Sequence, residues 1–372
     1  MKSALSILCL LLNVFLASCS FQTSLFKQLN MKYINKNLLI SPLSVYQVLG
    51  LTANGAKGKT LEQMLSVLES SDVADVNTIN KLILLVTNKL SSVEMANAVM
   101  TIEKPKSTFL QIARLYEATV DTLKSAAQVN NWCNVQTHGK IKEIIDEIEP
   151  NTVMILLNAL YFEGQWQTEF DSKNTTKKVF YHLNGIKRTT EVDTMSLYER
   201  FNYYEDSEVQ IVEMPYKDDS MSAVVILPNK DTDINDYIKS LDDFKLQKYF
   251  KRMTNEIVEL YLPKFTLEFS SLFNTALQKL GMMDAFGGKS DFSGILDQFI
   301  YIDKVIQKSF LSVDEQGTIA TSVTAEVIKV RGNGPRLFNA NRPFLFLIRN
   351  TLLPTNYEML FMSKIEDLSY IQ

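Results

Sequence analysis

Residues 53–60, with the sequence ANGAKGKT, nearly match a loop that binds nucleotide phosphates. In such a loop backbone amides surround the phosphates, and the residues at Lys59 and Thr60 would contact phosphate and metal. The loop normally follows a β-strand, whereas the residues before Ala53 have helical spacing, and Ala53 replaces the first glycine of the motif. The context argues against a nucleotide enzyme, an interpretation that would require ATP binding that is lost in Lys59→Ala.

Histidine chemistry has few candidates, because the chain contains only His138 and His182. Neither a Gly-x-Ser-x-Gly nor a His-Glu-x-x-His motif occurs, and we expect both histidines to be solvated and structural. Asp218 and Asp219 lie in a turn-like segment, where exposure is the expected state. No group of residues supports an enzyme, and none implies a metal or another cofactor.

The first 19 residues predict a secretory signal peptide. They contain one lysine, an apolar run from Ala4 to Ala17 and then small residues, a run too short for a membrane span. A bacterial lipoprotein cleavage box at 16–19 is an alternative. The sequon at Asn174 is consistent with secretion and glycosylation. Two of the three cysteines lie in this segment, which leaves Cys133 as a predicted buried structural thiol and no disulfide.

Composition and patterning predict a single large α+β domain over residues 20–372. The chain has 372 residues, is 46% hydrophobic and carries a net charge of −4, too small to imply a nucleic acid or an acidic membrane as partner. No later segment is apolar enough to span a bilayer. Helical patterns dominate the first third, and β-rich runs follow Thr152. Local signals predict a helix start at Ser41-Pro42, a capping box at 60–63, a helix from Ser271 to Leu280 closed by Gly281, and two buried strands near the C-terminus.

Residues 314–338 combine a glycine hinge, slim side chains and a basic tip. If a strand begins at Thr318, alternate residues through Thr324 place only small side chains on one face. That face would suit a strand that enters between existing strands, with Gly317 as the pivot. An ordinary edge strand that leads into a Gly-Pro turn explains the same pattern, and the residues alone leave both interpretations open.

Six blocks of the sequence, in this order, span nearly all of the chain after residue 20: NLLISPLSVYQVLGLTANGAKGKTLEQM, NNWCNVQTHGKIKEII, LLNALYFEGQWQTEFD, VEMPYKDDSMSAVVILP, LYLPKFTLEFSSLFNTALQKLGMMDAF and FNANRPFLFLIRN. In content, order and spacing these blocks resemble the serpin family. The resemblance implies an α+β fold of three β-sheets and about nine helices, with an exposed reactive-centre loop at about 315–338. It also implies a monomeric inhibitor rather than an enzyme. The target protease cleaves the loop and forms an acyl-enzyme, after which the loop inserts into the main sheet and the protease stays trapped.

The family's hinge pattern matches Glu315 to Thr318, and the small hinge residues that follow are Ala320, Thr321 and Ser322. In inhibitory members the cleaved bond follows the residue fourteen positions after the hinge glycine, which predicts cleavage at Arg331-Gly332. Lys329 and Arg336 are the fallback positions. An arginine there suits trypsin-like serine proteases of coagulation, fibrinolysis or inflammation. Together, the signal peptide and this reactive bond predict a secreted, extracellular inhibitor that its target protease binds covalently.

Other positions match residues that surround the inserting loop in the family. Lys264 matches the partner of Glu315, and Trp166 matches the tryptophan beneath the insertion point. The positions where the sheet parts correspond to Ser41, Ser44 and Asn158, and to Gln307, which replaces a common histidine with an amide that can also donate and accept.

Some features depart from the inhibitory pattern. Glu326 would place a charge on the inward face of the inserted strand, and Val323 is bulkier than is typical of the hinge. A non-inhibitory carrier or interaction protein with the serpin fold is therefore the alternative, although the small residues from Ala320 to Ser322 favour inhibition. No basic cluster lies near 68–95, which argues against activation by heparin. The compact chain and the missing histidine resemble secreted serpins of large DNA viruses of the poxvirus type.

Overall fold

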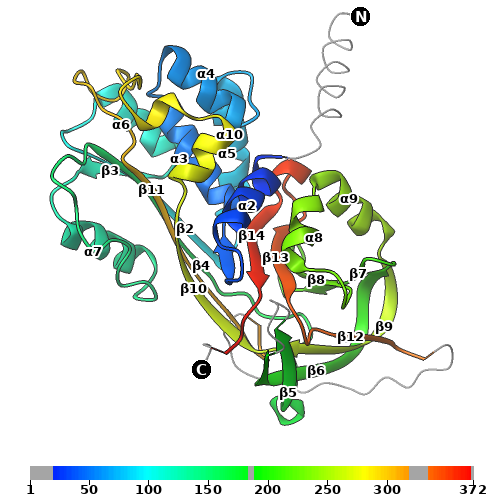
Figure 1. Cartoon of the computed structure of the whole chain (residues 1–372). Coiled ribbons are helices and arrows are strands. Elements are labelled where there is room, and N and C mark those ends of the chain that lie inside the picture. The colour runs from blue at the N-terminus through cyan, green and yellow to red at the C-terminus, as the bar shows by residue number, and fades with distance from the viewer. Residues whose placement is uncertain (1–19, 183–187, 318–333, 370–372) are drawn as a thin grey trace, which may run out of the picture.

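The computed structural model describes residues 20–182, 188–317 and 334–369, and Figure 1 shows the arrangement of its helices and sheets. The described residues form nine α-helices and two hydrogen-bonded sheets, and this architecture is the predicted α+β fold. The predicted signal peptide, residues 1–19, lies outside the described residues. The helices are α2 (Phe21–Lys32), α3 (Pro42–Ala53), α4 (Gly58–Val67), α5 (Val73–Thr87), α6 (Ser107–Leu115), α7 (Ala126–Gln136), α8 (Ile234–Ser240), α9 (Asp243–Arg252) and α10 (Asn274–Leu280).

The smaller sheet has five strands in the order β10-β11-β4-β2-β3. Its central strand β4 is buried at all nine positions, which explains why its sequence is a continuous apolar run rather than an alternating one. One face packs on the main core, and the other packs on α7 through Val129, Trp132 and Cys133. The strands are β10 (Phe265–Leu272), β11 (Lys304–Val313), β4 (Met154–Phe162), β2 (Val93–Thr101) and β3 (Thr119–Thr122).

The remaining nine strands form one connected sheet, in which eight follow the order β1-β14-β13-β8-β7-β6-β9-β12 and β5 pairs with β6 off this path. The long strand β6 pairs with β5 near its start, with β9 along its middle and with β7 at its end. Two of the three expected sheets are thus joined through β6. The strands are β1 (Leu38–Ile40), β5 (Thr176–His182), β6 (Arg188–Glu205), β7 (Val209–Pro215), β8 (Met221–Pro228), β9 (Thr254–Pro263), β12 (Arg336–Asn339), β13 (Phe344–Asn350) and β14 (Met359–Ile365).

The local signals are correct for α3 and wrong for α4. Ser41 caps α3, and its side chain accepts a hydrogen bond from the Ser44 amide. The predicted capping box does not exist, because α4 already begins at Gly58 and Thr60 lies inside the helix. The Thr60 hydroxyl instead accepts a hydrogen bond from the Asp291 amide, a contact distant in sequence. The residues before the phosphate-loop lookalike form helix α3, so the strand that such a loop requires is not there.

A second boundary also differs from the prediction. Helix α10 starts at Asn274 rather than Ser271, because residues 271 and 272 complete β10 and pair with β11. Its C-terminal end is correct, since Gly281 has a φ of 119°, the left-handed conformation that glycine adopts without strain.

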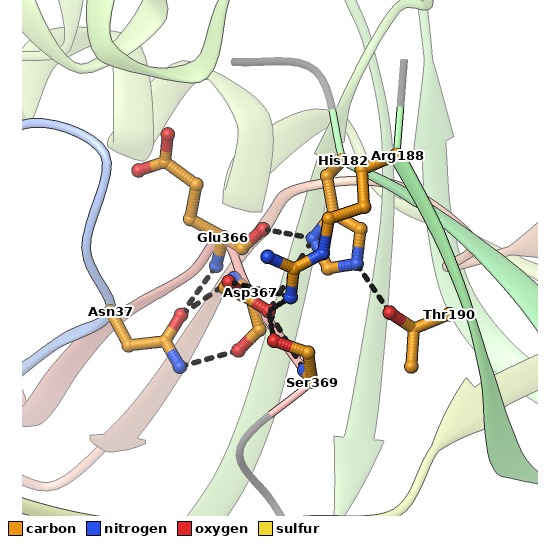
Figure 2. A network of polar contacts seen from close by, with 7 residues as sticks. All are labelled: Asn37, His182, Arg188, Thr190, Glu366, Asp367 and Ser369. Carbon is orange, nitrogen blue, oxygen red and sulfur yellow. Dashed lines mark hydrogen bonds and ion pairs between the residues drawn. The ribbon is translucent and has the colours of Figure 1, made fainter. Parts of the chain in front are cut away.

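Cys133 and His138 lie as predicted, whereas the prediction for His182 is wrong. Cys133 is fully buried in α7, and burial raises the pKa of its thiol to about 12, so it remains protonated. His138 is exposed just beyond α7. His182 is buried in β5, because the β5–β6 hairpin packs against the C-terminal segment 366–369 (Figure 2). Its ring nitrogens lie 2.9 Å from Thr190 Oγ1 and 3.3 Å from the Glu366 carbonyl oxygen.

Candidate functional site

The seam between β4 and β11 is the first part of the site. The two strands run parallel and pair over seven residues, with 304–310 of β11 opposite 155–161 of β4. Both have antiparallel partners on their outer sides, β10 for β11 and β2 for β4. Parallel pairing is somewhat less stable per residue than antiparallel pairing. A strand that entered the seam in the opposite direction would replace one parallel pair with two antiparallel pairs.

A row of buried polar side chains crosses the sheet at this seam. Ser271, Gln307, Asn158 and Asn97 lie opposite one another in register on β10, β11, β4 and β2. All four are buried. Polar side chains in the middle of a core are costly unless they are hydrogen-bonded, so their partners decide what the row does.

Gln307 and Asn158, the two members of the row on the seam, are hydrogen-bonded to the N-terminus of α3, and one side-chain bond joins them across the seam. The Gln307 side chain accepts from the Ser41 amide at 2.8 Å and donates to the Ser41 carbonyl oxygen at 3.0 Å. Across the seam it donates to Asn158 Oδ1 at 2.5 Å. Asn158 donates to Ser44 Oγ and Asn97 Oδ1. If the strands part, each side keeps its other partners, and the cost in side-chain hydrogen bonds is about 0.5–1.5 kcal/mol.

The segment Asp314–Gly317 after β11 is anchored to the chain that follows β4. The Trp166 amide donates to the Gln316 carbonyl oxygen at 3.1 Å, and its indole N–H donates to the Asp314 carbonyl oxygen at 3.0 Å. The Phe170 amide donates to the Glu315 carbonyl oxygen at 2.8 Å. The Trp166 ring is buried and stacks on another ring with centroids 4.6 Å apart. Three backbone carbonyls at the start of the predicted loop are therefore held beside the end of the seam.

The Glu315 carboxylate adds a side-chain contact to this anchor. Its two oxygens lie 2.7 Å from Lys264 Nζ and 2.7 Å from Thr175 Oγ1, so the structure brings together the pair Lys264 and Glu315 that the resemblance implied. Burial raises the pKa of the Glu315 carboxyl, but the hydrogen bonds from Lys264 and Thr175 outweigh it and the pKa lies below its usual value. The carboxylate is thus ionised at neutral pH.

Gly317 ends the anchor in a conformation and a space that only glycine fits. Its φ is +142°, and it forms an isolated bridge with Gln165. A Cβ atom at this position would lie 2.1 Å from the Gly164 carbonyl oxygen and 2.9 Å from the Trp166 nitrogen. Both contacts are with backbone, which cannot rotate away.

The far end of the predicted loop is shorter than the range 315–338. Residues 336–338 belong to β12, which pairs in parallel with β9, and the Arg336 guanidinium lies 2.9 Å from Glu205. Arg336 is therefore held in a sheet, which makes it a poor fallback cleavage position. The remaining predicted loop residues lie outside the described residues: Thr318, Ala320, Thr321, Ser322, Val323, Glu326, Lys329, Arg331 and Gly332.

Sequence reasoning missed Asn97 and Thr175. Asn97 could have been noticed as a single amide within an otherwise apolar strand, whereas nothing near Thr175 in the sequence points to Glu315. Asn174 is exposed in a short 3-10 turn, a position open to glycosylation. Across the described ranges, no three histidine, cysteine or acidic side chains gather as a metal site would require, and no helix has the length and apolarity needed to cross a membrane.

Comparison with known proteins identifies the family. The family model described as serpin (serine protease inhibitor) matches residues 16–368. Iripin-2 of Ixodes ricinus is 32% identical over 338 residues, which cover 85% of both chains. The leukocyte elastase inhibitor of Xenopus laevis is 32% identical over 363 residues, covering 91% of this chain and 96% of the relative. The native crystal structure of the thermophilic serpin Tengpin has a TM-score of 0.83 and 31% identity, with 94% of this chain and 93% of that chain covered.

The chain therefore belongs to the serpin family, a family of serine protease inhibitors and not of enzymes. The predicted viral origin and the reactive bond at Arg331-Gly332 are not tested by these comparisons and stay predictions.

Proposed function

We propose that this chain is a secreted suicide-substrate inhibitor of trypsin-like serine proteases, cleaved at Arg331-Gly332. The observation that carries the proposal is the position of the anchor 314–317 at the end of the seam between β4 and β11. Residues that follow Gly317 and enter the seam from this end would run antiparallel to both strands. Cleavage of the loop frees its N-terminal part to enter while Gly317 remains the pivot.

The length of the freed segment fits this movement. Arg331 lies fourteen positions after Gly317, and at about 3.4 Å per residue an extended strand of this length spans about 50 Å. The seam offers unpaired edges to such a strand once the backbone pairing of β4 with β11 and the side-chain bond between Gln307 and Asn158 both separate. A protease bound through its serine to Arg331 would be carried from one end of the sheet to the other.

Trypsin-like specificity follows from the side chain at the proposed cleavage position. A protease whose specificity pocket contains an aspartate binds an arginine through a charge-assisted pair. Arg336 is engaged with Glu205 within β12, which favours a cut before that strand.

Secretion is supported by the signal-like segment and by the start of the fold directly after it. Helix α2 begins at Phe21, and Ser20 is buried with its hydroxyl 2.7 Å from Asp243 Oδ1. The exposed sequon at Asn174 is accessible to the glycosylation machinery. Expression of the full chain in eukaryotic cells tests this part. We expect protein in the medium that begins at Ser20 and loses its glycan in Asn174→Gln; exclusively cell-retained protein would refute secretion.

The inhibitory mechanism is tested by incubating the purified protein with trypsin, plasmin and a urokinase-type protease. We expect a covalent complex that survives denaturing electrophoresis, and a released C-terminal peptide that begins at Gly332. Arg331→Ala should abolish the complex with these arginine-directed proteases. Lys329→Ala is the matched control at a neighbouring basic position and should still form it.

The alternative, a non-inhibitory carrier with the serpin fold, predicts cleavage of the loop without a covalent complex and without a change in thermal stability. A cleaved inhibitory chain gains a central strand, so its thermal unfolding midpoint should rise strongly after the cut. Clean cleavage without a complex, together with an unchanged midpoint, would refute the inhibitory mechanism.

A further inference from the structure

A cleft of about 520 Å³ lies where the β5–β6 hairpin meets the connection between β12 and β13. Its wall is mainly apolar and includes the ring of Tyr181, while Lys230, Asn341 and Arg342 supply polar groups. A volume of this size accommodates a small organic molecule. The cleft is separate from the seam and from the loop anchor, since none of its residues belongs to either.

Among the described residues, two positive charges in this cleft lack a carboxylate partner. Arg342 is 7% exposed, and its guanidinium donates to the Pro228 carbonyl oxygen at 2.9 Å and to Asn341 Oδ1 at 3.5 Å, both neutral acceptors. Lys230 is exposed, and within the described residues no acidic group lies within ion-pair distance of either side chain. Buried charges are normally paired, so an uncompensated arginine beside a free lysine is unusual.

The third basic residue of the cleft is already neutralised. Arg188 lies 3.3 Å from Asp367, and the same carboxylate lies 3.6 Å from His182 Nδ1 (Figure 2). Asp367 also accepts hydrogen bonds from the Ser369 amide and hydroxyl. The Asp367 carboxylate therefore pairs with groups on its own side of the cleft and not with Lys230 or Arg342, whose charges can bind another partner.

We propose that this cleft binds a small organic anion, whose sulfonate, sulfate or carboxylate group contacts Lys230 and Arg342 and whose apolar body lies against Tyr181. The Asn341 side-chain amide can add a donor, because its oxygen faces Arg342. An inorganic anion would make the charge contacts but not the apolar contact with Tyr181. A neutral aromatic molecule would make the apolar contact but not the charge contacts. The site therefore selects for both features in one molecule.

The cleft is formed before any ligand arrives. The Tyr181 amide donates to the Asn341 carbonyl oxygen at 2.8 Å, which joins β5 to the β12–β13 connection. The bond from Arg342 to Pro228 joins the same connection to the end of β8. A preformed site loses little conformational entropy on binding. Lys230, Asn341 and Arg342 also line a neighbouring cleft of about 460 Å³ with Arg336 and Glu205, which places the anion close to β12, the strand that follows the loop.

Calorimetric titration of the full chain with 2-naphthalenesulfonate tests the proposal, with 2-naphthalenesulfonamide and inorganic sulfate as the two partial probes. We expect the sulfonate to bind at least tenfold more tightly than either. Lys230→Gln should weaken binding about fivefold, as loss of one exposed charge contact implies, and Lys230→Glu should abolish it. Lys289→Gln removes an exposed lysine elsewhere and should leave the affinity unchanged. Rising salt should weaken binding.

Several results would overturn the proposal. Sulfonate binding that persists in Lys230→Glu would place the ligand elsewhere. Equal affinity for sulfate and the sulfonate would reduce the site to an inorganic anion site, and binding of a heparin octasaccharide without the sulfonate would indicate a polysaccharide surface instead. Arg342→Gln is the second variant, and circular dichroism checks its fold because Arg342 is buried. Lys230 is exposed, so its variants decide the question even if Arg342→Gln does not fold.

Discussion

The anchor that holds the start of the loop depends on the absence of a side chain at Gly317. In Gly317→Ala the new methyl group would lie 2.1 Å from a carbonyl oxygen and 2.7 Å from the Gln165 Cα atom, at a φ of +142°. The neighbouring atoms are backbone and cannot move without breaking the anchor. We therefore expect the alanine variant to release residues 314–317 from the chain that follows β4.

The free-energy change for local opening of the anchor follows from the backbone strain that alanine introduces and from the hydrogen bonds that are lost. The positive φ costs an alanine about 1–2 kcal/mol. Release of the anchor breaks the backbone bonds made by the Trp166 and Phe170 amides, worth about 0.5–1.5 kcal/mol each. The total is about 2–5 kcal/mol, which corresponds to about a 30- to 5,000-fold increase in local opening.

Amide hydrogen exchange measures this opening directly. In Gly317→Ala the amides of Trp166 and Phe170 should exchange about 30- to 5,000-fold faster than in the unaltered chain, while amides in α3 keep their protection. Gly287→Ala is the matched control, because no atom lies within 4 Å of its would-be Cβ. If Trp166 and Phe170 exchange at the same rates in both variants, the steric argument for Gly317 is wrong.

Three further predictions concern the seam, the anchor and the chain start. Gln307→Leu should lower the melting midpoint by several degrees because it leaves buried partners unpaired, whereas Gln307→His should largely keep it; equal midpoints would contradict the role of the polar row. The pKa of Glu315 lies below its usual value of about 4.5, so the stabilising effect of the carboxylate is present at neutral pH. This effect is lost as the pH falls from about 4.5 through the lowered pKa. The difference in melting midpoint between the unaltered chain and Glu315→Gln should therefore disappear at pH values below that pKa. A chain that starts at Ser20 should be more stable by about 1–3 kcal/mol than one with an added glycine before it, because its N-terminal ammonium would take the place of the Ser20 amide that donates to the Asp243 carboxylate. This difference should vanish in Asp243→Asn.

Much of the fold could be predicted from local pattern. The apolar run of β4, the Ser41 cap and the left-handed Gly281 each depend on neighbours in the sequence, and each lies where the sequence indicated. The errors arise where distant segments compete for the same group. Thr60 resembled a helix cap, but its hydroxyl is taken by the amide of Asp291 more than 200 residues away.

The candidate site was likewise predictable from the sequence in part only. The identity of the hinge glycine, the pairing of Lys264 with Glu315 and the amide at Gln307 came from residue types at family positions. Tertiary structure decided which bonds those residues make: that a single side-chain bond crosses the seam, that Thr175 shares the Glu315 carboxylate, and that His182 is buried rather than solvated. Sequence specifies local conformation because backbone preferences act over a few residues, whereas burial and hydrogen-bond partners depend on segments that only the folded chain brings together.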